Sequence, residues 1–133
     1  IVENMENFQL LLTIQTVVFY GLFFVSGLLL KFFPPKKNRF YGFRTNKALE
    51  SDENWFFAQG IASGLIVIFS ITFFFISIFI KYLTGFLYQA FTLYTIIDTL
   101  LLLVATFMIY FLTEDKLRRK YRLEMNLEPE IED

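Results

Sequence analysis

Three long apolar segments, separated by charged ones, dominate the sequence. Residues 8–33 carry no charge before Lys31, residues 55–80 carry none, and residues 86–112 carry only Asp98. At about 1.5 Å per residue, each segment is long enough to cross the ~30 Å hydrocarbon layer of a bilayer as an α-helix. The pattern therefore predicts an all-α integral membrane protein with three transmembrane helices packed in a bundle.

The breaks between these segments predict where the helices end. A double proline at 34–35 closes the first helix, because proline cannot donate a backbone hydrogen bond and moves the preceding residue out of the helical region. Ser51 or Asp52 is suited to cap the second helix. Only residues 81–85 separate the second and third segments, which predicts an antiparallel hairpin with Lys81 marking the far end of the second helix.

The length of the chain, 133 residues, corresponds to one domain. We expect a single membrane domain over residues 5–133, with a structured loop at 34–54 and a charged cytoplasmic tail at 113–133. We interpret Met5 as the natural start of the chain. The basic part of the tail is predicted to continue the third helix past the lipid headgroups, and the acidic end of the tail is predicted to be disordered.

Composition supports a lipid environment and argues against catalysis. Hydrophobic residues make up 56% of the chain, and 19 residues are phenylalanine. The chain has no cysteine and no histidine, which excludes disulfides, thiol catalysis and the commonest general base and zinc ligand. No phosphate-binding glycine loop, HExxH motif or paired metal carboxylates occur. We therefore predict that the protein is not an enzyme and has no cofactor and no metal.

The distribution of basic residues predicts the orientation in the membrane. Of the 12 lysines and arginines, six lie in residues 31–47, five in residues 116–122, and Lys81 is the remaining one. Three spans place the first two groups on one side, which the positive-inside bias assigns to the cytoplasm, with the N-terminus outside. Against a membrane, these basic residues contact anionic lipid more simply than nucleic acid.

Each apolar segment also carries small or hydroxyl residues at helical spacing, the kind of residue through which helices pack in lipid. These predicted packing faces, with the phenylalanines turned toward lipid, are Thr13, Thr16, Tyr20 and Gly27 in the first segment, Gly60, Ser63, Gly64, Ser70 and Ser77 in the second, and Thr92, Thr95, Thr99, Thr106 and Thr113 in the third. The alternative is that the same residues line a pathway.

Asp98 is the sharpest single signal, because an ionised carboxylate near the middle of a span costs at least ~2.5 kcal/mol. It shares a helix face with Thr95, Thr99 and Leu102, so it is expected to point into the bundle. It could hold a cation, relay a proton or anchor a partner. Alternatively, it is a structural acid that fixes helix register. Asp98→Asn is expected to fold and insert, since the amide retains the hydrogen bonds.

The loop between the first two spans contains residues suited to specific contacts. Gly42 permits a positive φ or a close backbone approach, and Asn38 and Thr45 can bond the backbone of a turn. Trp55 and Tyr41 suit the interfacial aromatic belt. A loop that only set the topology would not need these residues in close order.

Arg44 is the basic residue of this loop for which we predict a specific contact. Its guanidinium offers five donors in a fixed fork. We expect it to turn back toward the bundle and pair with Asp52 or Glu53, or with carbonyls that end the first helix. Lys36, Lys37 and Arg39 are interpreted as topology signals that also contact lipid headgroups.

The motif Asn38-x-x-Tyr41-Gly42-Phe43-Arg44-Thr45, followed ten residues later by Trp55-x-x-Ala58-x-x-x-x-x-Gly64, resembles the signature of the SdpI family. These are small bacterial membrane proteins named for immunity to a secreted peptide toxin. The resemblance covers residues 34–64 and implies that the motif residues are Asn38, Gly42, Arg44, Thr45, Trp55 and Gly64. The chain departs from the family at Gln59, where Asn or His is more frequent, and at Asn46, where a proline often follows the threonine.

The resemblance implies a multi-pass protein of the bacterial cytoplasmic membrane that confers immunity, or bacteriocin resistance, against a membrane-active peptide toxin. A second hypothesis is a signalling protein that sequesters a cytoplasmic regulator with its basic loop and charged tail. A third is a small ion-coupled transporter that uses Asp98 and requires a homo-oligomer, because three spans alone are too few to form a pathway.

Overall fold

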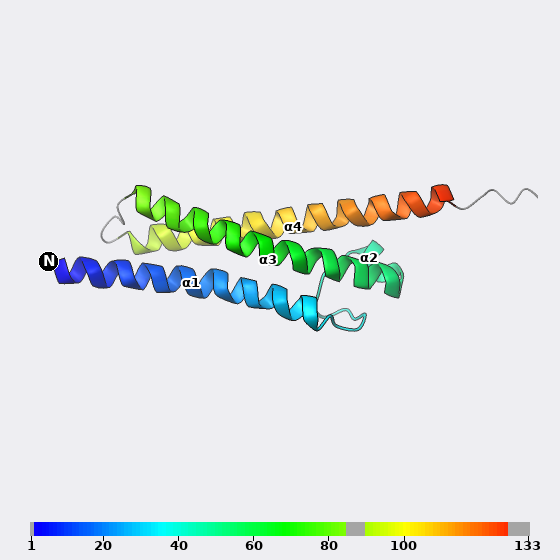
Figure 1. The fold of residues 1–133 in the computed structure, drawn as a ribbon, viewed down its shortest axis with the longest axis horizontal. Helices are drawn as coiled ribbons and strands as arrows, with labels where there is room; N and C mark the ends of the chain where they lie inside the picture. Colours follow the sequence, from blue (N-terminus) through cyan, green and yellow to red (C-terminus); the bar gives the residue numbers. More distant parts are fainter. Residues whose placement is uncertain (1, 85–89, 128–133) are drawn as a thin grey trace, which may run out of the picture.

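The computed structural model describes residues 2–84 and 90–127, and its elements over these residues are helices. The helices are α1 (Val2–Phe32), α2 (Asn46–Glu50), α3 (Asp52–Leu83) and α4 (Phe91–Leu127). Figure 1 shows the three long helices lying side by side, with α2 beside the start of α3. Because α1, α3 and α4 are each long and apolar enough to cross a membrane, the all-α prediction with three spanning helices is confirmed.

Local sequence explains where these helices begin and end. The Ser51 side chain accepts a hydrogen bond from the Asn54 amide at 3.0 Å, so the predicted cap of α3 is confirmed. Thr45 caps α2 in the same way through the Ala48 amide, at 3.3 Å. Helix α1 ends at Phe32, just before the double proline.

The observed helices are longer than the apolar segments that predict them. Helix α1 begins at Val2, and α4 continues past residue 112 to Leu127, so the predicted extension of the third helix is confirmed. Helices α3 and α4 form the predicted antiparallel pair (Figure 1). The first residues predicted for the third span, 86–89, and the acidic end of the tail, 128–133, lie outside the described residues.

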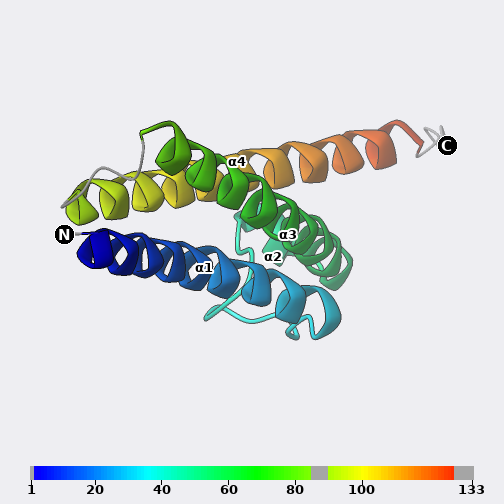
Figure 2. The same ribbon diagram turned by 60° about the vertical axis from the view of Figure 1, so that its left-hand side comes forward.

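Helix α3 is the central element, since it packs against both α1 and α4, which make little contact with each other (Figure 2). One buried cluster joins Tyr20 of α1, Phe73 of α3 and Ala105 of α4. A second cluster joins the short helix to the bundle through Ala48 and Leu117, with Ala58 between them. The second cluster therefore packs α2 against both α3 and α4.

The predicted packing faces are confirmed for α1 and in part for α3. Thr16, Tyr20 and Gly27 of α1 are buried, and a Cβ added at Gly27 would lie 2.7 Å from Ile66 Cγ2. In α3 the serines of the face (Ser63, Ser70 and Ser77) are buried. Its two glycines, however, have no atom within 4 Å of an added Cβ, so Gly60 and Gly64 do not bring helices of this chain together.

The predicted threonine face of α4 is wrong for three of its five residues, whereas Thr113 is buried as predicted and Thr95 is half-buried. Thr92, Thr99 and Thr106 are exposed, and the buried face consists of Tyr94, Asp98, Ala105, Ile109, Thr113 and Leu117. The hydroxyl of Thr99 donates to the Thr95 carbonyl and that of Thr106 to the Leu102 carbonyl, each at 2.8 Å. A helical threonine satisfies its own hydroxyl in this way, so it can face lipid without a neighbour.

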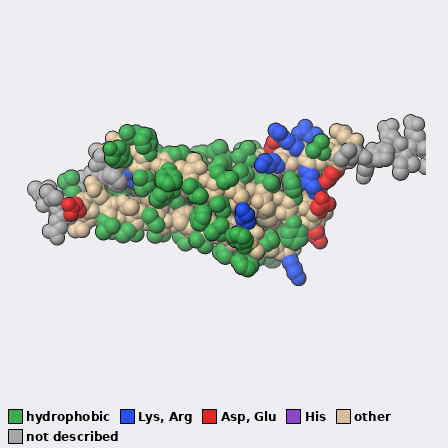
Figure 3. Space-filling view, viewed as in Figure 1, with side chains coloured by type: hydrophobic (Ala, Val, Ile, Leu, Met, Phe, Trp, Pro, Cys, Tyr) green, Lys and Arg blue, Asp and Glu red, His purple; other side chains and the backbone are tan. Residues whose placement is uncertain are grey.

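Hydrophobic and charged side chains are segregated along the bundle. Figure 3 shows hydrophobic side chains over the length of the three helices, with most charged ones gathered at the end that carries α2 and the last turns of α4. Such a distribution is that of a multi-pass membrane protein with one strongly charged end.

Candidate functional site

The loop between α1 and α2 is held on the start of α3 by the side chain of Gln59. The Phe43 amide donates to Gln59 Oε1, and Gln59 Nε2 donates to the Phe43 carbonyl, both at 2.8 Å. Gln59 is fully buried. One amide side chain therefore satisfies both backbone groups of one loop residue, as a neighbouring strand would.

One helical turn earlier, Trp55 holds the other end of the loop. Its Nε1 donates to the Pro35 carbonyl at 2.7 Å, and the side chain is completely buried. The prediction of an interfacial Trp55 is therefore wrong: the ring lies beneath the loop, because its single donor finds a partner there rather than at the headgroups. We call Pro35, Gly42, Phe43, Trp55 and Gln59 the loop latch.

Gly42 is required by the geometry of the loop latch. Its φ of +100° lies in the region that side chains rarely adopt, which confirms the predicted positive φ. A Cβ added there would also lie 2.8 Å from Gln59 Oε1 and 3.3 Å from Trp55 Cη2. The loop can thus approach α3 closely only with glycine at this position.

Asn38 forms the turn at the tip of the loop, as predicted. Its Oδ1 accepts from the Phe40 amide at 2.8 Å and the Tyr41 amide at 3.0 Å, and its Nδ2 donates to the Lys36 carbonyl at 2.8 Å. Tyr41 itself is exposed. Asn38 and the Thr45 cap therefore shape the loop on either side of Gly42 and Phe43, the segment that Gln59 holds against α3.

The predicted partners of Arg44 are wrong. Arg44 Nη1 donates to the Arg39 carbonyl within the loop. Asp52 instead pairs with Lys37 at 2.9 Å, and Glu53 pairs with Lys120 of α4 at 2.7 Å. The reason is α2, which was not predicted and whose five residues lie between Arg44 and the start of α3.

A buried ion pair lies at the other end of the bundle. Lys81 Nζ is 2.7 Å from Asp98 Oδ2, and the two side chains are 1% and 0% exposed. Asp98 also accepts from Ser77, from Thr16 at 3.4 Å and from Tyr20 at 3.5 Å. Lys81 donates further to Thr16 and, at 3.0 Å, to Ser77. We call these five residues the buried network, to which all three long helices contribute.

The network confirms that Asp98 points into the bundle, and it shows a partner, Lys81, that the sequence analysis did not assign to it. Lys81 does lie in the last turn of α3, as predicted, but its side chain turns back into the bundle toward Asp98. The two residues are 17 apart in sequence, and the hairpin brings them together. The sequence did contain a signal for this pairing: a lysine near the end of the first hairpin helix and an acid inside the second.

The structure thus separates the predicted site residues into two groups. Asn38, Tyr41, Gly42, Arg44, Thr45, Glu53, Trp55 and Gln59 gather at the charged end of the bundle, whereas Asp98 belongs to the buried network. Along α3, Gln59 and Lys81 are about 33 Å apart at 1.5 Å per residue. Gly64 lies between these two ends and contributes to neither. In the described ranges, no three acidic residues gather closely enough to hold a metal.

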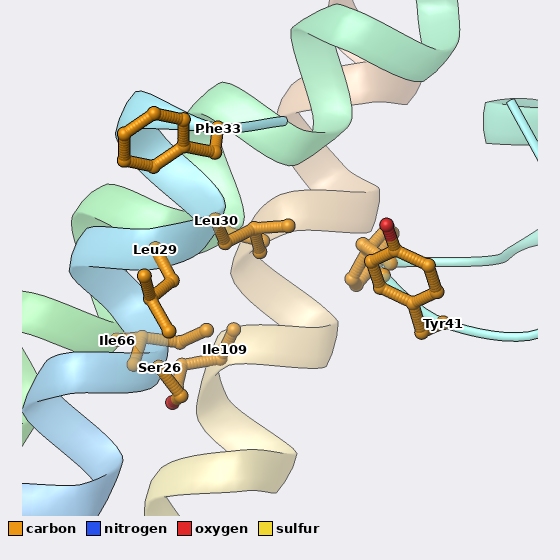
Figure 4. A pocket seen from close by; sticks show the side chains of 10 residues that line it. Ser26, Leu29, Leu30, Phe33, Tyr41, Ile66 and Ile109 are labelled. Atoms are coloured by element: carbon orange, nitrogen blue, oxygen red, sulfur yellow. The ribbon is translucent and has the colours of Figure 1, made fainter. Parts of the chain in front are cut away.

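An apolar groove of about 590 Å³ opens beneath the latched loop. It is lined by Leu29 and Leu30 of α1, Phe33 directly after α1, Tyr41 of the loop, Ile66 of α3 and Ile109 of α4, among others. Figure 4 shows Tyr41 opposite the leucines of α1, with Ile66 and Ile109 below. The loop latch therefore fixes one wall of a groove whose other walls come from all three long helices.

Residues 35–112 match the family model described as the SdpI/YfhL protein family. The match begins at Pro35 and contains the loop latch together with Ser77, Lys81 and Asp98 of the buried network. Neither the curated proteins nor the solved structures contain a match.

Proposed function

The chain belongs to the SdpI/YfhL protein family, and from this membership we propose that it protects a bacterial cell from a secreted, membrane-active peptide toxin. In this proposal the protein acts without catalysis, from the cytoplasmic membrane, by binding an apolar part of the peptide. The observation that carries the proposal is the apolar groove beneath the latched loop.

The groove has the properties that peptide capture within a bilayer requires. Because lipid tails are as apolar as the peptide, affinity must come from close packing and not from removal of water. A wall that is already fixed favours binding, since ordering a mobile wall on binding costs free energy. The two hydrogen bonds of Gln59 and the glycine at 42 supply such a fixed wall.

Filling the groove is expected to abolish protection. Leu29 lines the groove and is 56% exposed, so a tryptophan at this position can enter the groove without disturbing the core. We expect the wild-type chain to raise the survival of a sensitive bacterium exposed to secreted membrane-active peptides, and Leu29→Trp to lose most of that gain at equal abundance.

Leu22→Trp is the matched control, because Leu22 is on the same helix, is 68% exposed and is not among the residues that line the groove. It should protect like the wild type. Unchanged survival on wild-type expression against every peptide tried would refute the protective function. Full protection by Leu29→Trp would refute only the groove as its site.

We further propose that the charged end of the bundle faces the cytoplasm and the N-terminus faces outward. Since Lys81 is buried against Asp98, the opposite end has no exposed basic side chain among the described residues. The positive-inside bias is thereby stronger than the sequence count indicates. Reporter fusions after residues 47 and 125 should read cytoplasmic, and one at Thr84 should read external. A cytoplasmic reading at Thr84 would invert the topology.

A second candidate function is the sequestration of a cytoplasmic regulator. Helix α4 continues beyond its apolar segment to Leu127, and Lys116 and Arg119 are exposed on this extension, on the same side as the loop. A soluble protein recovered with the wild type and lost with a chain that ends after residue 115 would favour this candidate. Ion transport through Asp98 is not proposed, because Lys81 and three hydroxyls already surround its carboxylate.

A further inference from the structure

Two adjoining hollows lie where α2 meets α4. One, of about 540 Å³, is lined by Arg44, Lys47, Glu50, Tyr110, Glu114 and Arg118 among others. The other, of about 360 Å³, is lined by Lys47, Arg118, Tyr121 and Arg122. They share Lys47 and Arg118, and together we call them the basic hollow. It is separate from the apolar groove, with which it has no lining residue in common.

We infer that the basic hollow is a binding site for the headgroup of a membrane phospholipid, one that carries a hydrogen-bond donor beyond its phosphate. Arg44, Lys47 and Arg122 would bind the phosphate, and Glu114 would accept the donor. This site is independent of the proposed protective function, since a lipid site can exist whatever the bundle does to a toxin.

The charge of the basic hollow supports binding of a phosphate. Four cations line it against two carboxylates, and one of those, Glu114, already pairs with Arg118 at 3.2 Å. Within the described part of the chain, no carboxylate lies within 4.0 Å of the cationic groups of Arg44, Lys47 or Arg122. Arg44 uses one nitrogen on the Arg39 carbonyl, which leaves other donors of its fork for a phosphate oxygen.

The position of Lys47 is fixed without loss of its charge. Its Nζ lies 3.9 Å from the centre of the Tyr121 ring, a cation–π contact that orients the ammonium but leaves it positive. The side chain is thus held at the junction of the two hollows before any ligand arrives. A preformed cation of this kind lowers the ordering cost of binding an anion.

Glu114 supplies the second, independent observation. Its Oε2 is buried in the structure without a hydrogen-bond partner, whereas Oε1 accepts from Arg118. A buried acceptor left unpaired is costly, so a group that donates to it would be favoured. The hydroxyls of a phosphatidylglycerol headgroup, or the ammonium of phosphatidylethanolamine, are such donors. The trimethylammonium of phosphatidylcholine is not.

The position of the hollow along α4 favours a lipid headgroup over a soluble phosphate as the ligand. Tyr110 lines its inner side, the apolar segment ends at residue 112, and charged residues begin at Glu114. Aromatic residues at the end of a span, with basic residues a few positions further on, mark the headgroup layer of a membrane. The cations of the hollow therefore lie at the depth where lipid phosphates are already concentrated.

Lipid retention by the purified full-length chain tests the inference. The chain is purified in detergent containing equal amounts of phosphatidylglycerol, phosphatidylethanolamine and phosphatidylcholine, and bound lipid is identified by native mass spectrometry. We expect one retained lipid, with about a tenfold preference for the first two over phosphatidylcholine. The double change Lys47→Gln with Arg122→Gln should remove retention, and Arg44→Lys, which keeps the charge but loses the fork, should reduce it.

Lys36→Gln with Lys116→Gln is the control, because it removes the same charge from exposed residues outside the hollow. Retention should survive it. Equal loss in the control would show general attraction to anions and overturn the site, and so would equal retention of phosphatidylcholine. Displacement of the lipid by millimolar inorganic phosphate would overturn the assignment to a lipid headgroup.

Discussion

Replacing Asp98 with asparagine is expected to destabilise the bundle by about 3 kcal/mol, at the lower end of the cost of leaving a buried charge unpaired. The reason is Lys81, which is 1% exposed and would lose its counter-charge. Near the end of α3, the long lysine side chain can extend toward the interface, which keeps the cost low in the range. Unfolding of the purified protein in detergent micelles measures the loss.

The double variant Lys81→Met with Asp98→Leu is the informative control. Replacing a buried ion pair by apolar residues of similar size is often neutral, so this variant should recover most of the stability lost by Asp98→Asn. The Thr16 hydroxyl retains a bond to the Leu12 carbonyl, at 2.9 Å, when its partners are removed. An Asp98→Asn variant as stable as the wild type would show that the pair does not hold the bundle together.

The same two variants decide between the two interpretations of Asp98. If the double variant is stable and still protects, the buried network serves only to align the three helices. If it is stable and does not protect, the ionisable groups themselves are needed for function. Sequence alone predicted tolerance of Asp98→Asn because an amide keeps the hydrogen bonds; the ammonium of Lys81 changes that expectation.

The sequence predicts the spans well because lipid imposes a strict rule. Backbone groups in hydrocarbon must be paired internally, so an uncharged segment of sufficient length can only be a helix or part of a barrel. The turn at Asn38, the positive φ at Gly42 and the cap at Ser51 were also predictable, since each depends on residues close in sequence.

Contacts between distant segments were harder to predict. Lys81 was interpreted by its position near a turn, although its direction depends on which face of α3 meets Asp98. Arg44 was assigned the wrong partner because the five-residue α2 was not predicted. Trp55 was predicted to lie at the membrane interface from its residue type alone, whereas its ring lies beneath the loop and donates to the Pro35 carbonyl. In each case the missing information was the path of another segment.

Replacing Gln59 with leucine is expected to release the loop from α3 while the bundle remains inserted. The change keeps the size of the side chain but leaves the amide and the carbonyl of Phe43 without partners. At about 1–3 kcal/mol for each of the two unpaired groups, the latched conformation loses about 2–6 kcal/mol. Amide hydrogen exchange at residues 40–44 should then rise by about 30-fold or more, and protection should fall as the groove loses its fixed wall.

Gln15→Leu is the matched control, with the same substitution and the opposite expectation. Both polar atoms of the Gln15 side chain are buried without a hydrogen-bond partner, so removing them costs no bond and should leave stability unchanged or raised. If Gln59→Leu exchanged at residues 40–44 no faster than Gln15→Leu, the two hydrogen bonds would not be what fastens the loop. If it exchanged faster yet protected fully, the loop would be latched for some purpose other than shaping the groove.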